Sequence, residues 1–489
     1  MKNVLVHALP SGRAALPLVL AALLAGCAAG PDYQAPAPLA DNALPRPANT
    51  APGSSSAFGA AQAWRADIDL EAPWWQQLGS PSLDALIDQA LQASPTLAAA
   101  QAQLRQAEEL QGAQERATQW PRADLGVGSA RQHSSPSAQG LPGDGRTFSL
   151  HSASVSVQYQ LDVSGGNRRA LQALAARTDY RRYQLAGARL DLAARIASTA
   201  ITQARIAGQA EALEAIARNQ AAQTDIAQER LRLGQAMPAD VQALQAALEQ
   251  TRASALLLRK QAQQSAHLLA VLAGRAPGAE PLPAFSLGDF TLPAELPQVL
   301  PSELVRQRPD IQAAEALVRV ASAEHGVAVA RMYPQIRLSA NLGSQALTTG
   351  ALFGGGSAVW GLIAQLTQPL FDPALPAQQR AALAALDAAA AQYQMVVLDA
   401  LRSVADALRA IEADAQVLAT LERADTAAQA GLQSTQQQLK LGAASDLQWL
   451  VVQQQALQLR SSLVAAQAQR LADSAALFQA VGAGWRSAM

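Results

Sequence analysis

Three long stretches without proline limit what this chain can fold into more than any other feature. They cover residues 143–237, 239–276 and 377–489. Proline breaks helix interiors, so its absence permits very long helices. Within the first stretch, apolar side chains recur every three or four positions, as at Leu185, Ala188 and Leu192. A helix over residues 166–233 would be a rod of about 100 Å, at about 1.5 Å per residue. The pattern therefore predicts coiled-coil or helical-array packing.

The composition agrees with long helices. Hydrophobic residues make up 50% of the 489 positions, but aromatic residues only 4% and charged residues only 15%. Alanine, leucine and glutamine, which are all good helix formers, fill most of the difference. The formal net charge of −1 gives no reason to expect a nucleic-acid partner.

The N-terminal segment is typical of a bacterial lipoprotein signal. Lys2 and Arg13 supply positive charge, and residues 14–25 form an apolar run too short to cross a bilayer, which needs about 20 residues. The run ends in Leu-Ala-Gly-Cys, with the only cysteine of the chain at Cys27. We expect residues 1–26 to be removed and Cys27 to carry a covalent lipid anchor. The alternative is an ordinary secretory signal followed by a chance cysteine.

Residues 27–60 are rich in proline, alanine, glycine and serine and are predicted to form a tether without a core. We expect Trp64, Trp74 and Trp75, which follow, to pack on the surface of neighbouring helices rather than to bind a ligand. Beyond residue 26 we find no apolar stretch long enough for a membrane helix. Further membrane contact is therefore predicted to use strands.

The chain also resembles itself at a nearly constant offset of about 210 residues. We interpret residues 61–275 and 308–489 as two structural repeats joined by a linker at 276–307. The matched pairs are Ser94-Pro95-Thr96-Leu97 with Arg308-Pro309-Asp310-Ile311, Trp120-Pro121 with Tyr333-Pro334, Leu161-Asp162 with Phe371-Asp372, Arg169-Ala170 with Arg380-Ala381, and Leu231-Arg232-Leu233-Gly234 with Leu439-Lys440-Leu441-Gly442.

Each half carries two strand-like segments in which apolar and polar residues alternate. The apolar positions are Leu125 in a weaker segment ending at Ser129, then Val155, Val157, Tyr159 and Leu161, then Ile336, Leu338, Ala340 and Leu342, then Trp360, Leu362, Ala364 and Leu366. Residues 132–146 and 346–357, rich in glycine, serine or proline, are predicted to be hairpin loops.

Four such strands cannot close a barrel across a membrane, because open edges in lipid would leave backbone groups without partners. Transmembrane barrels begin at about eight strands. If these strands span a membrane, several chains must share one barrel, and three chains would supply twelve strands. The polar positions would then face a water-filled lumen, and the helices would continue the tube. The alternative is a small soluble sheet capping a helical bundle.

With these features the chain resembles the outer-membrane factor family of tripartite efflux systems. The resemblance is to its OprM-like lipoprotein branch, and TolC is more distant. The resemblance covers essentially the whole mature chain. It is carried by Cys27, Gly30-Pro31-Asp32-Tyr33, Trp74-Trp75, residues 83–91, Arg308-Pro309-Asp310-Ile311, Ala314-Glu315, Tyr333-Pro334-Gln335-Ile336 and Gln368-Pro369-Leu370-Phe371.

The resemblance implies an α+β membrane protein: a homotrimeric twelve-stranded barrel, four strands per chain, continued by a long α-helical periplasmic barrel. It implies a passive duct for small molecules such as drugs. The implied partners are outer-membrane lipid, a periplasmic adaptor and an inner-membrane pump of the resistance-nodulation-division type. Apart from the lipid on Cys27, no cofactor is expected.

The same resemblance assigns roles to the two Leu-X-Leu-Gly turns. Gly234 and Gly442 would lie at the periplasmic tips of helical hairpins, where the adaptor docks, although each could simply terminate a helix. Asp240 would belong to the first tip; its alternative is an N-cap role. Relatives carry a leucine and an aspartate at the closed constriction. Here those positions are Leu447 and Val451, with Asp446 nearby as a possible replacement for the missing charge.

Nothing in the sequence favours an enzyme. The five histidines have no metal-ligand spacing, and neither a nucleophile elbow nor a phosphate-binding glycine loop is present. Two other functions stay open: a lipid-anchored periplasmic scaffold that conducts nothing, and a duct for protein secretion.

Overall fold

The structure is a computed structural model, and it describes residues 33–34, 50–51, 58, 60–135, 140, 142, 144–279, 281–298, 304 and 308–485. The chain divides into two compact units. The first, here called the sheet unit, comprises Met1–Pro36, Arg105–Tyr180 and Ala314–Tyr393. The second, the helical unit, comprises Ala37–Leu104, Arg181–Ala313 and Gln394–Met489.

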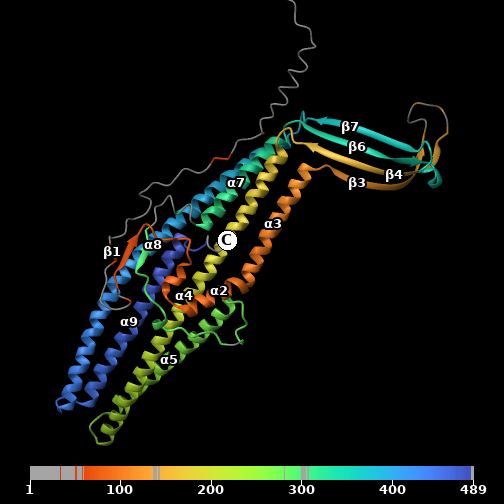
Figure 1. Ribbon diagram of the computed structural model, residues 1–489. Helices are drawn as coiled ribbons and strands as arrows, with labels where there is room; N and C mark the ends of the chain where they lie inside the picture. The colour runs from red at the N-terminus through yellow and green to blue at the C-terminus, as the bar shows by residue number, and fades with distance from the viewer. Residues whose placement is uncertain are drawn as a thin grey trace, which may run out of the picture. The chain divides into compact units, whose positions relative to one another are not determined.

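The principal elements recur in one order in both halves of the chain, namely a helix, two strands and two long helices (Figure 1). In the first half these are α3 (Pro95–Gln119), β3 (Arg122–Ser134), β4 (Arg146–Leu161), α4 (Gly166–Arg232) and α5 (Pro238–Leu272). In the second half they are α7 (Pro309–Ala330), β6 (Gln335–Ala346), β7 (Ala358–Thr367), α8 (Ala374–Lys440) and α9 (Asp446–Val481).

The sheet unit is built around one antiparallel sheet with the strand order β3-β4-β6-β7. The two central strands, β4 and β6, come from different halves of the chain and pair from Leu161 with Ile336 to His151 with Ala346. Strands β3 and β7 are the two edges, and in the part of the chain that the structure describes neither has a second neighbour.

The predicted strand positions are confirmed, but the strands of the first hairpin are longer than expected. Strand β3 has 13 residues and β4 has 16, and they pair up to Ser134 and Arg146. The predicted 132–146 loop therefore begins later and ends earlier than the glycine and proline content indicated. Residues at the hairpin end, such as Thr147 and Ser149, are polar but still continue the ladder.

The helices that follow the sheet begin at equivalent aspartates. Asp162 accepts hydrogen bonds from the backbone N–H groups of Asn167 (2.9 Å) and Arg168 (2.8 Å) at the start of α4. Asp372 accepts one from the N–H of Ala374 (2.9 Å) at the start of α8. These carboxylates satisfy donors that have no partner within a helix. The Leu-Asp and Phe-Asp pair singled out in the sequence thus serves as a matched pair of helix starts.

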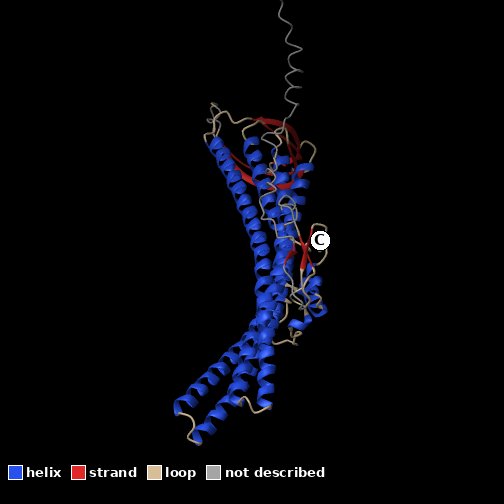
Figure 2. Ribbon diagram, turned by 90° about the vertical axis from the view of Figure 1, so that its left-hand side faces the viewer, coloured by secondary structure: helices blue, strands red, loops and turns tan. Residues whose placement is uncertain are grey.

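The helical unit contains most of the buried apolar side chains. Its core includes Ile196 and Ile201 of α4 and Leu471 and Phe478 of α9, all of them buried. Helices α4 and α9 approach closely at Gly208, because a Cβ atom there would lie 2.9 Å from a methyl carbon of Val464. The α4–α5 and α8–α9 pairs form two helical hairpins, and Figure 2 shows how fully helices dominate the described chain.

Trp74 packs onto a neighbouring helix as expected, but the expected surface position of Trp74 and Trp75 is wrong. These side chains lie in η1 (Trp74–Leu78), are 1% and 5% exposed, and belong to the core of the helical unit. The Trp74 ring stacks on Phe478 at 6.1 Å between centroids. The sequence placed them near the start of the ordered chain, but it could not show that η1 packs against α9 and that α2 (Pro81–Ala93) packs against η1.

A small three-stranded sheet, β1 (Thr50–Ala51), β2 (Gln62–Arg65) and β5 (Glu295–Pro297), also belongs to the helical unit. Arg470 of α9 holds the segment around β2. Its fully buried guanidinium donates to the carbonyl oxygens of Phe58 (3.2 Å) and Ala60 (3.0 Å). Gln62 completes the contact through a hydrogen bond to Ser474 (3.1 Å).

One helix among the described residues, α8, is apolar and long enough to cross a membrane by length and composition alone. This differs from the sequence expectation, which found no such stretch after residue 26. The helix begins with an alanine-rich run, and only 11% of its most apolar 18-residue window is buried within the chain. A single helix of this kind is weak evidence for a span, because packed helices pass the same test.

Candidate functional site

The four strands of the sheet unit place their predicted apolar residues on one face and in register. Leu125 lies opposite Val155, Val155 opposite Leu342, and Leu342 opposite Trp360. The next row continues through Val157, Ala340 and Leu362, and a further row joins Leu161, Ile336 and Leu366. The alternation predicted separately for each strand therefore forms one continuous apolar surface.

This apolar sheet face is exposed rather than covered by the rest of the described chain. Leu125, Leu342 and Trp360 are 74%, 66% and 79% exposed. Soluble monomers rarely leave a patch of this extent open to water. The face runs along β4 from Ala153 to Leu161, about 26 Å at about 3.3 Å per residue. Outer-membrane barrels carry an apolar band about 25 Å tall.

The opposite face of the sheet is mainly polar. Ser156 lies opposite Asn341, and Gln158 lies opposite Ser339. Near the helix end of β3, Arg122 forms an ion pair with Asp124 at 2.9 Å. Ile363 on β7 interrupts the pattern on this face. One face thus suits lipid and the other water.

Aromatic side chains gather where the strands meet the helices. Trp120 lies just before β3, Tyr333 just before β6, and Phe371 just after β7, and they are 70%, 49% and 89% exposed. Aromatic residues are enriched at membrane–water interfaces, where one side of the ring is wet and the other is in lipid. The two matched pairs Trp-Pro and Tyr-Pro therefore occupy equivalent positions at one end of the apolar sheet face.

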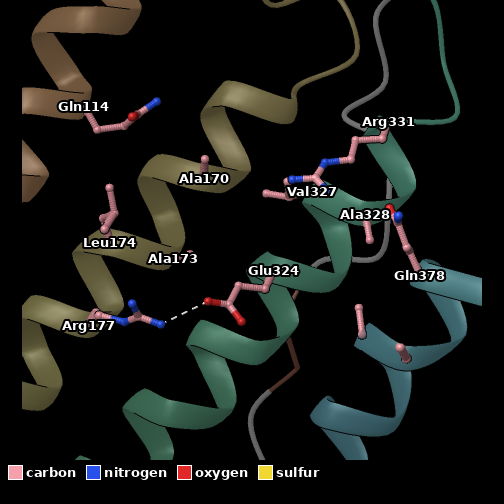
Figure 3. A pocket seen from close by; sticks show the side chains of 12 residues that line it. Gln114, Ala170, Ala173, Leu174, Arg177, Glu324, Val327, Ala328, Arg331 and Gln378 are labelled. Carbon is pink, nitrogen blue, oxygen red and sulfur yellow. Dashed lines mark hydrogen bonds and ion pairs between the residues drawn. The ribbon is translucent and has the colours of Figure 1, made fainter. Parts of the chain in front are cut away.

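The helices of the sheet unit leave a cavity of about 520 Å³ between them (Figure 3). Small side chains such as Ala170, Ala173 and Ala328 line it, and Arg177 donates to Glu324 across it at 3.1 Å. Among the described residues, no group of three or more histidine, cysteine, aspartate or glutamate side chains is placed to hold a metal ion. The cavity offers an ion pair and an aliphatic wall.

The two turns at the hairpin tips of the helical unit have the same backbone structure. Gly234 and Gly442 both have φ of +74°, which strongly favours glycine. In the first turn, the N–H of Gly234 donates to Leu231 and that of Gln235 to Arg230. The second turn repeats this with Gly442 to Leu439 and Ala443 to Gln438. Each is a Schellman motif, in which these bonds satisfy the last carbonyls of the helix.

The helices leaving the two turns are capped by different residues. At the first tip, a carboxylate oxygen of Asp240 accepts a hydrogen bond from the N–H of Met237 (3.1 Å), the residue before α5. Asp240 is therefore in the first turn of the helix rather than at the N-cap itself. At the second tip, the Ser445 hydroxyl accepts from the N–H of Gln448 (3.2 Å) and is the N-cap of α9.

The three predicted constriction residues lie in the first two turns of α9. Leu447 is half-buried, Asp446 is exposed, and Val451 is 44% exposed. Leu447 and Val451 are four residues apart, so they share one face of the helix. Leu450, between them, is buried. The structure thus places these residues together near the second tip, and their role at a constriction stays a prediction.

A network of amide side chains just beyond these residues was missed by the sequence analysis. Asn219 of α4 donates to Gln453 of α9 at 2.7 Å. Gln223 donates to Asn219 at 2.6 Å and to Gln454 at 3.1 Å. Asn219 and Gln223 are buried, and buried polar networks of this kind fix how two helices align. Only the abundance of glutamine hinted at it.

Cys27, the predicted lipidation site, lies outside the described residues. Arg168, Arg169, Arg181 and Arg182 are sequence candidates for binding lipid headgroups or forming inter-helix pairs, and the structure gives partners for two of them. Arg169 is buried and donates to Gln172 (3.0 Å), and Arg181 donates to Gln184 (2.7 Å). Arg181 also donates to Gln103 of α3 (3.3 Å), so its contacts fit an inter-helix role better than a headgroup site.

Comparison with known proteins agrees with this geometry. The family model for outer membrane efflux proteins matches residues 86–275 and 300–483. The chain is 28% identical to the antibiotic efflux pump outer membrane protein ArpC of Pseudomonas putida, over 96% of this chain and 94% of that one. It is 29% identical to the outer membrane protein OprJ of Pseudomonas aeruginosa, over 96% and 95%.

The fold has the same relatives. The solved structure of the outer-membrane channel OprN superimposes with a TM-score of 0.81 and 25% identity, covering 94% of this chain and all of that one. A sheet with one lipid-type face, joined to very long helices with matched tips, defines an outer-membrane channel protein. The chain belongs to the outer membrane efflux protein family. The resemblance drawn from its motifs is thereby confirmed.

Proposed function

We propose that three copies of this chain close a twelve-stranded barrel in the outer membrane and form the exit duct of an efflux pump. The main support for this proposal is the structure of the four-stranded sheet. Its apolar face is exposed in register across four strands, and its edges β3 and β7 have no partner within the described chain. A strand edge in lipid leaves backbone groups unsatisfied, so the sheet needs neighbours to close it.

Three copies fit this requirement with a hollow centre. Side chains fill the interior of a barrel of about eight strands, but a twelve-stranded barrel is wider. The polar face, with Asn341 and Gln158, would therefore line a water-filled lumen. Strand β3 of one copy would pair with β7 of the next. The long helices would continue the tube on the periplasmic side, next to the girdle formed by Trp120, Tyr333 and Phe371.

The ends of the chain follow from the same proposal. Residues 1–26 would be removed as a signal peptide, and Cys27 would carry the lipid that anchors the tether, residues 27–60. Residues 61–275 and 308–489 would be two repeats joined at 276–307. The Leu-Ala-Gly-Cys motif that ends at Cys27 supports the lipid anchor. The equivalent aspartates at the helix starts and the equivalent Schellman turns support the two repeats.

The hairpin tips would be the periplasmic end of the duct. Gly234, Asp240 and Gly442 would shape the surface on which a periplasmic adaptor docks, in a complex with an inner-membrane pump of the resistance-nodulation-division type. Exposed Leu233 and Leu441 beside the glycines favour an apolar contact there. The duct would be passive, with no cofactor besides lipid, and small molecules such as drugs would be its cargo, as the name of ArpC suggests.

Planar-bilayer recording of the purified protein, paired with gels of heated and unheated samples, tests the duct. We expect discrete conductance steps and a heat-sensitive band at three times the chain mass. Extract from cells lacking the protein is the control. A chain that stays monomeric and leaves the bilayer silent would instead be the periplasmic scaffold.

The constriction has its own test in Val451. Three valines would form an apolar ring, so cations should gain no attraction at the closed tip. Changing Val451→Asp should raise cation selectivity, because a carboxylate ring creates a local negative potential. Val451→Asn is the matched control, because asparagine has nearly the same shape as aspartate but carries no charge. Equal selectivity in all three proteins would place Val451 away from the constriction.

A further inference from the structure

A second cavity of about 250 Å³ continues the cavity of Figure 3 toward the strands of the sheet unit. The two cavities share Ala170 of α4 and Val327 and Arg331 of the α7 region in their linings. The second cavity is also lined by Gln160 of β4 and Gln335 of β6, which lie on the polar face of the sheet. Both cavities therefore lie on the side of the sheet that would face the lumen of the proposed duct.

The first cavity has the size and the lining of a site for a small molecule. Its volume of about 520 Å³ lies within the range of about 300–1,000 Å³ that such sites occupy. Aliphatic side chains form its wall, among them Ala173 and Leu174 on α4 and Ala328 on α7. A pocket of this kind binds the apolar body of a ligand, and a few polar groups set the orientation of that ligand.

Arg331 is a polar group of this cavity that has no partner of its own. Glu324 is paired with Arg177 at 3.1 Å, and it lies seven residues before Arg331, about 10 Å along the helix at about 1.5 Å per residue. In the part of the chain that the structure describes, no ion pair or side-chain hydrogen bond involves Arg331. Its side chain is exposed and extends from the end of α7 toward α4 (Figure 3). A free guanidinium offers a forked pair of donors that matches a carboxylate.

The other charges near the two cavities do not cancel the charge of Arg331. Asp162, whose carboxylate lines the second cavity, already accepts hydrogen bonds from the N–H groups of Asn167 and Arg168. On the polar face of the sheet, Arg337 lies opposite Gln160 and adds a further cation, which has no ion-pair partner among the described residues. The surroundings therefore favour an anion over a cation.

We propose that the first cavity is a luminal binding site for organic anions, in which Arg331 binds a carboxylate and the aliphatic wall contacts the apolar body. The inference rests on the proposed function, because only a closed duct gives the cavity a lumen to face. In a trimer, three such sites would lie where the barrel joins the helical tube. An organic anion that passes through the duct would pause there, whereas a cation of the same shape would not.

Block of the single-channel current in planar bilayers tests the site with a defined probe, naphthoate. We expect brief interruptions of the current in the parent protein. Naphthylmethylammonium, which has the same apolar body and the opposite charge, should cause far fewer. Arg331→Gln should weaken the naphthoate block about tenfold, because a charged hydrogen-bond donor is lost. Arg331→Lys should lie between these two proteins, since it keeps the charge but loses the forked geometry.

Three further variants separate a binding site from the overall charge of the lumen. Arg337→Gln removes a cation that lines neither cavity, so it should lower the preference for chloride over potassium as Arg331→Gln does, but leave the naphthoate block unchanged. Ala328→Leu fills part of the first cavity, so it should weaken the block and leave the ion preference unchanged. Arg380→Gln, at an exposed position of α8 outside both linings, should change neither property.

Equal weakening of the naphthoate block by Arg331→Gln and Arg337→Gln would indicate a diffuse potential and would overturn the proposal. A parent channel that conducts but is blocked by neither probe, or by both equally, would overturn it too. If Arg331→Gln fails to form the heat-sensitive trimer, Arg331→Lys and Ala328→Leu provide the same test. A parent protein that conducts nothing would instead contradict the proposed function, and this site with it.

Discussion

The sheet unit and the helical unit use the same apolar residue types in opposite ways. Leu342 on the sheet is 66% exposed, whereas Leu471 in α9 is fully buried. Burying one leucine stabilises a fold by about 1.5–3 kcal/mol, so a row of exposed ones is costly in water. The difference teaches that the helical unit has a buried core of its own, although residues such as Leu256 and Leu398 stay exposed, whereas the sheet exposes a continuous apolar face that needs a non-aqueous environment.

The backbone shows the same contrast. A long helix such as α4 satisfies nearly all of its own N–H and C=O groups. The sheet satisfies them only between neighbours, so among the described residues β3 and β7 each keep one open side. The helical unit can therefore be tested by ordinary stability measurements, whereas the sheet must be tested by assembly.

The largest expected effect separates the two faces of the sheet. Leu342→Arg places a charge on the apolar sheet face, and an arginine at the bilayer midplane costs about 2–4 kcal/mol for each copy. We expect the outer-membrane trimer to disappear from unheated gels. Asn341→Arg, one residue away on the polar face, should still assemble. Loss of trimer in both variants would contradict the assignment of faces.

The second effect concerns the buried cation of the helical unit. Arg470→Ala should lower the free energy of unfolding by about 4 kcal/mol, because it leaves the buried carbonyl oxygens it serves without a donor. Denaturant unfolding of the purified protein measures this. Arg402→Ala removes an exposed arginine from α8, whose surface ion pairs are screened by water, so it should change the free energy of unfolding far less. Comparable losses of stability in the two variants would mean that the hydrogen bonds of Arg470 do not hold the segment around β2.

The third effect measures the apolar core of the same unit. Ile201→Ala should cost about 3 kcal/mol, since the side chain is almost fully buried and leaves a cavity. Val417→Ala, at a half-exposed position on α8, is the control and should cost under about 1 kcal/mol. Thermal melting of both variants gives the comparison. A small change at Ile201 would indicate a core loose enough to collapse around the cavity.

A smaller effect is expected at the hairpin tips. Gly442→Ala should destabilise the helical unit by about 1 kcal/mol, because alanine is strained at φ of +74°. Gly431→Ala, inside α8 where a Cβ meets no atom within 4 Å, should stabilise it by up to about 1 kcal/mol. Opposite signs in melting experiments would sharpen the assignment of Gly442 as a turn residue.

The smallest effect depends on pH. Burial and the neighbouring carboxyl of Asp473 raise the pKa of Asp414 to about 7. Between pH 4 and 7 the folded chain holds a proton that the unfolded chain releases, so stability falls as pH rises through this range. Asp414→Asn should therefore stabilise by about 1 kcal/mol at pH 8, since the site is partly solvated, and by almost nothing at pH 4. Melting curves at both pH values would show it, and a pH-independent difference would contradict it.

Periodicity in the sequence predicted the long helices and the two faces of the sheet. The helix expected over residues 166–233 is α4, Gly166–Arg232, and each alternating strand aligned its apolar residues with those of its neighbours. Local chemistry decides both features: proline-free runs permit the helix, and period-two alternation separates the faces. The glycines of the tips were also found, because a positive φ leaves a clear residue signature.

Contacts across long sequence separations could not be found in this way. Trp74 reaches Phe478, Arg470 reaches Phe58, and Tyr33 reaches Glu315, and no period or spacing links the members of these pairs. The ends of β3 and β4 were missed for a related reason. Polar hairpin residues continue the ladder because pairing with a neighbour, rather than hydrophobicity, sustains a strand there.

The open sides of β3 and β7 have a genetic consequence. In the proposed three-chain ring each subunit pairs with two others. A chain with one mutated edge strand therefore also prevents wild-type chains in the same ring from closing the barrel. When wild-type and mutant chains are made in equal amounts and mix at random, only about one ring in eight contains no mutant chain. A mutation confined to either edge should thus behave as dominant, and one confined to the tether as recessive.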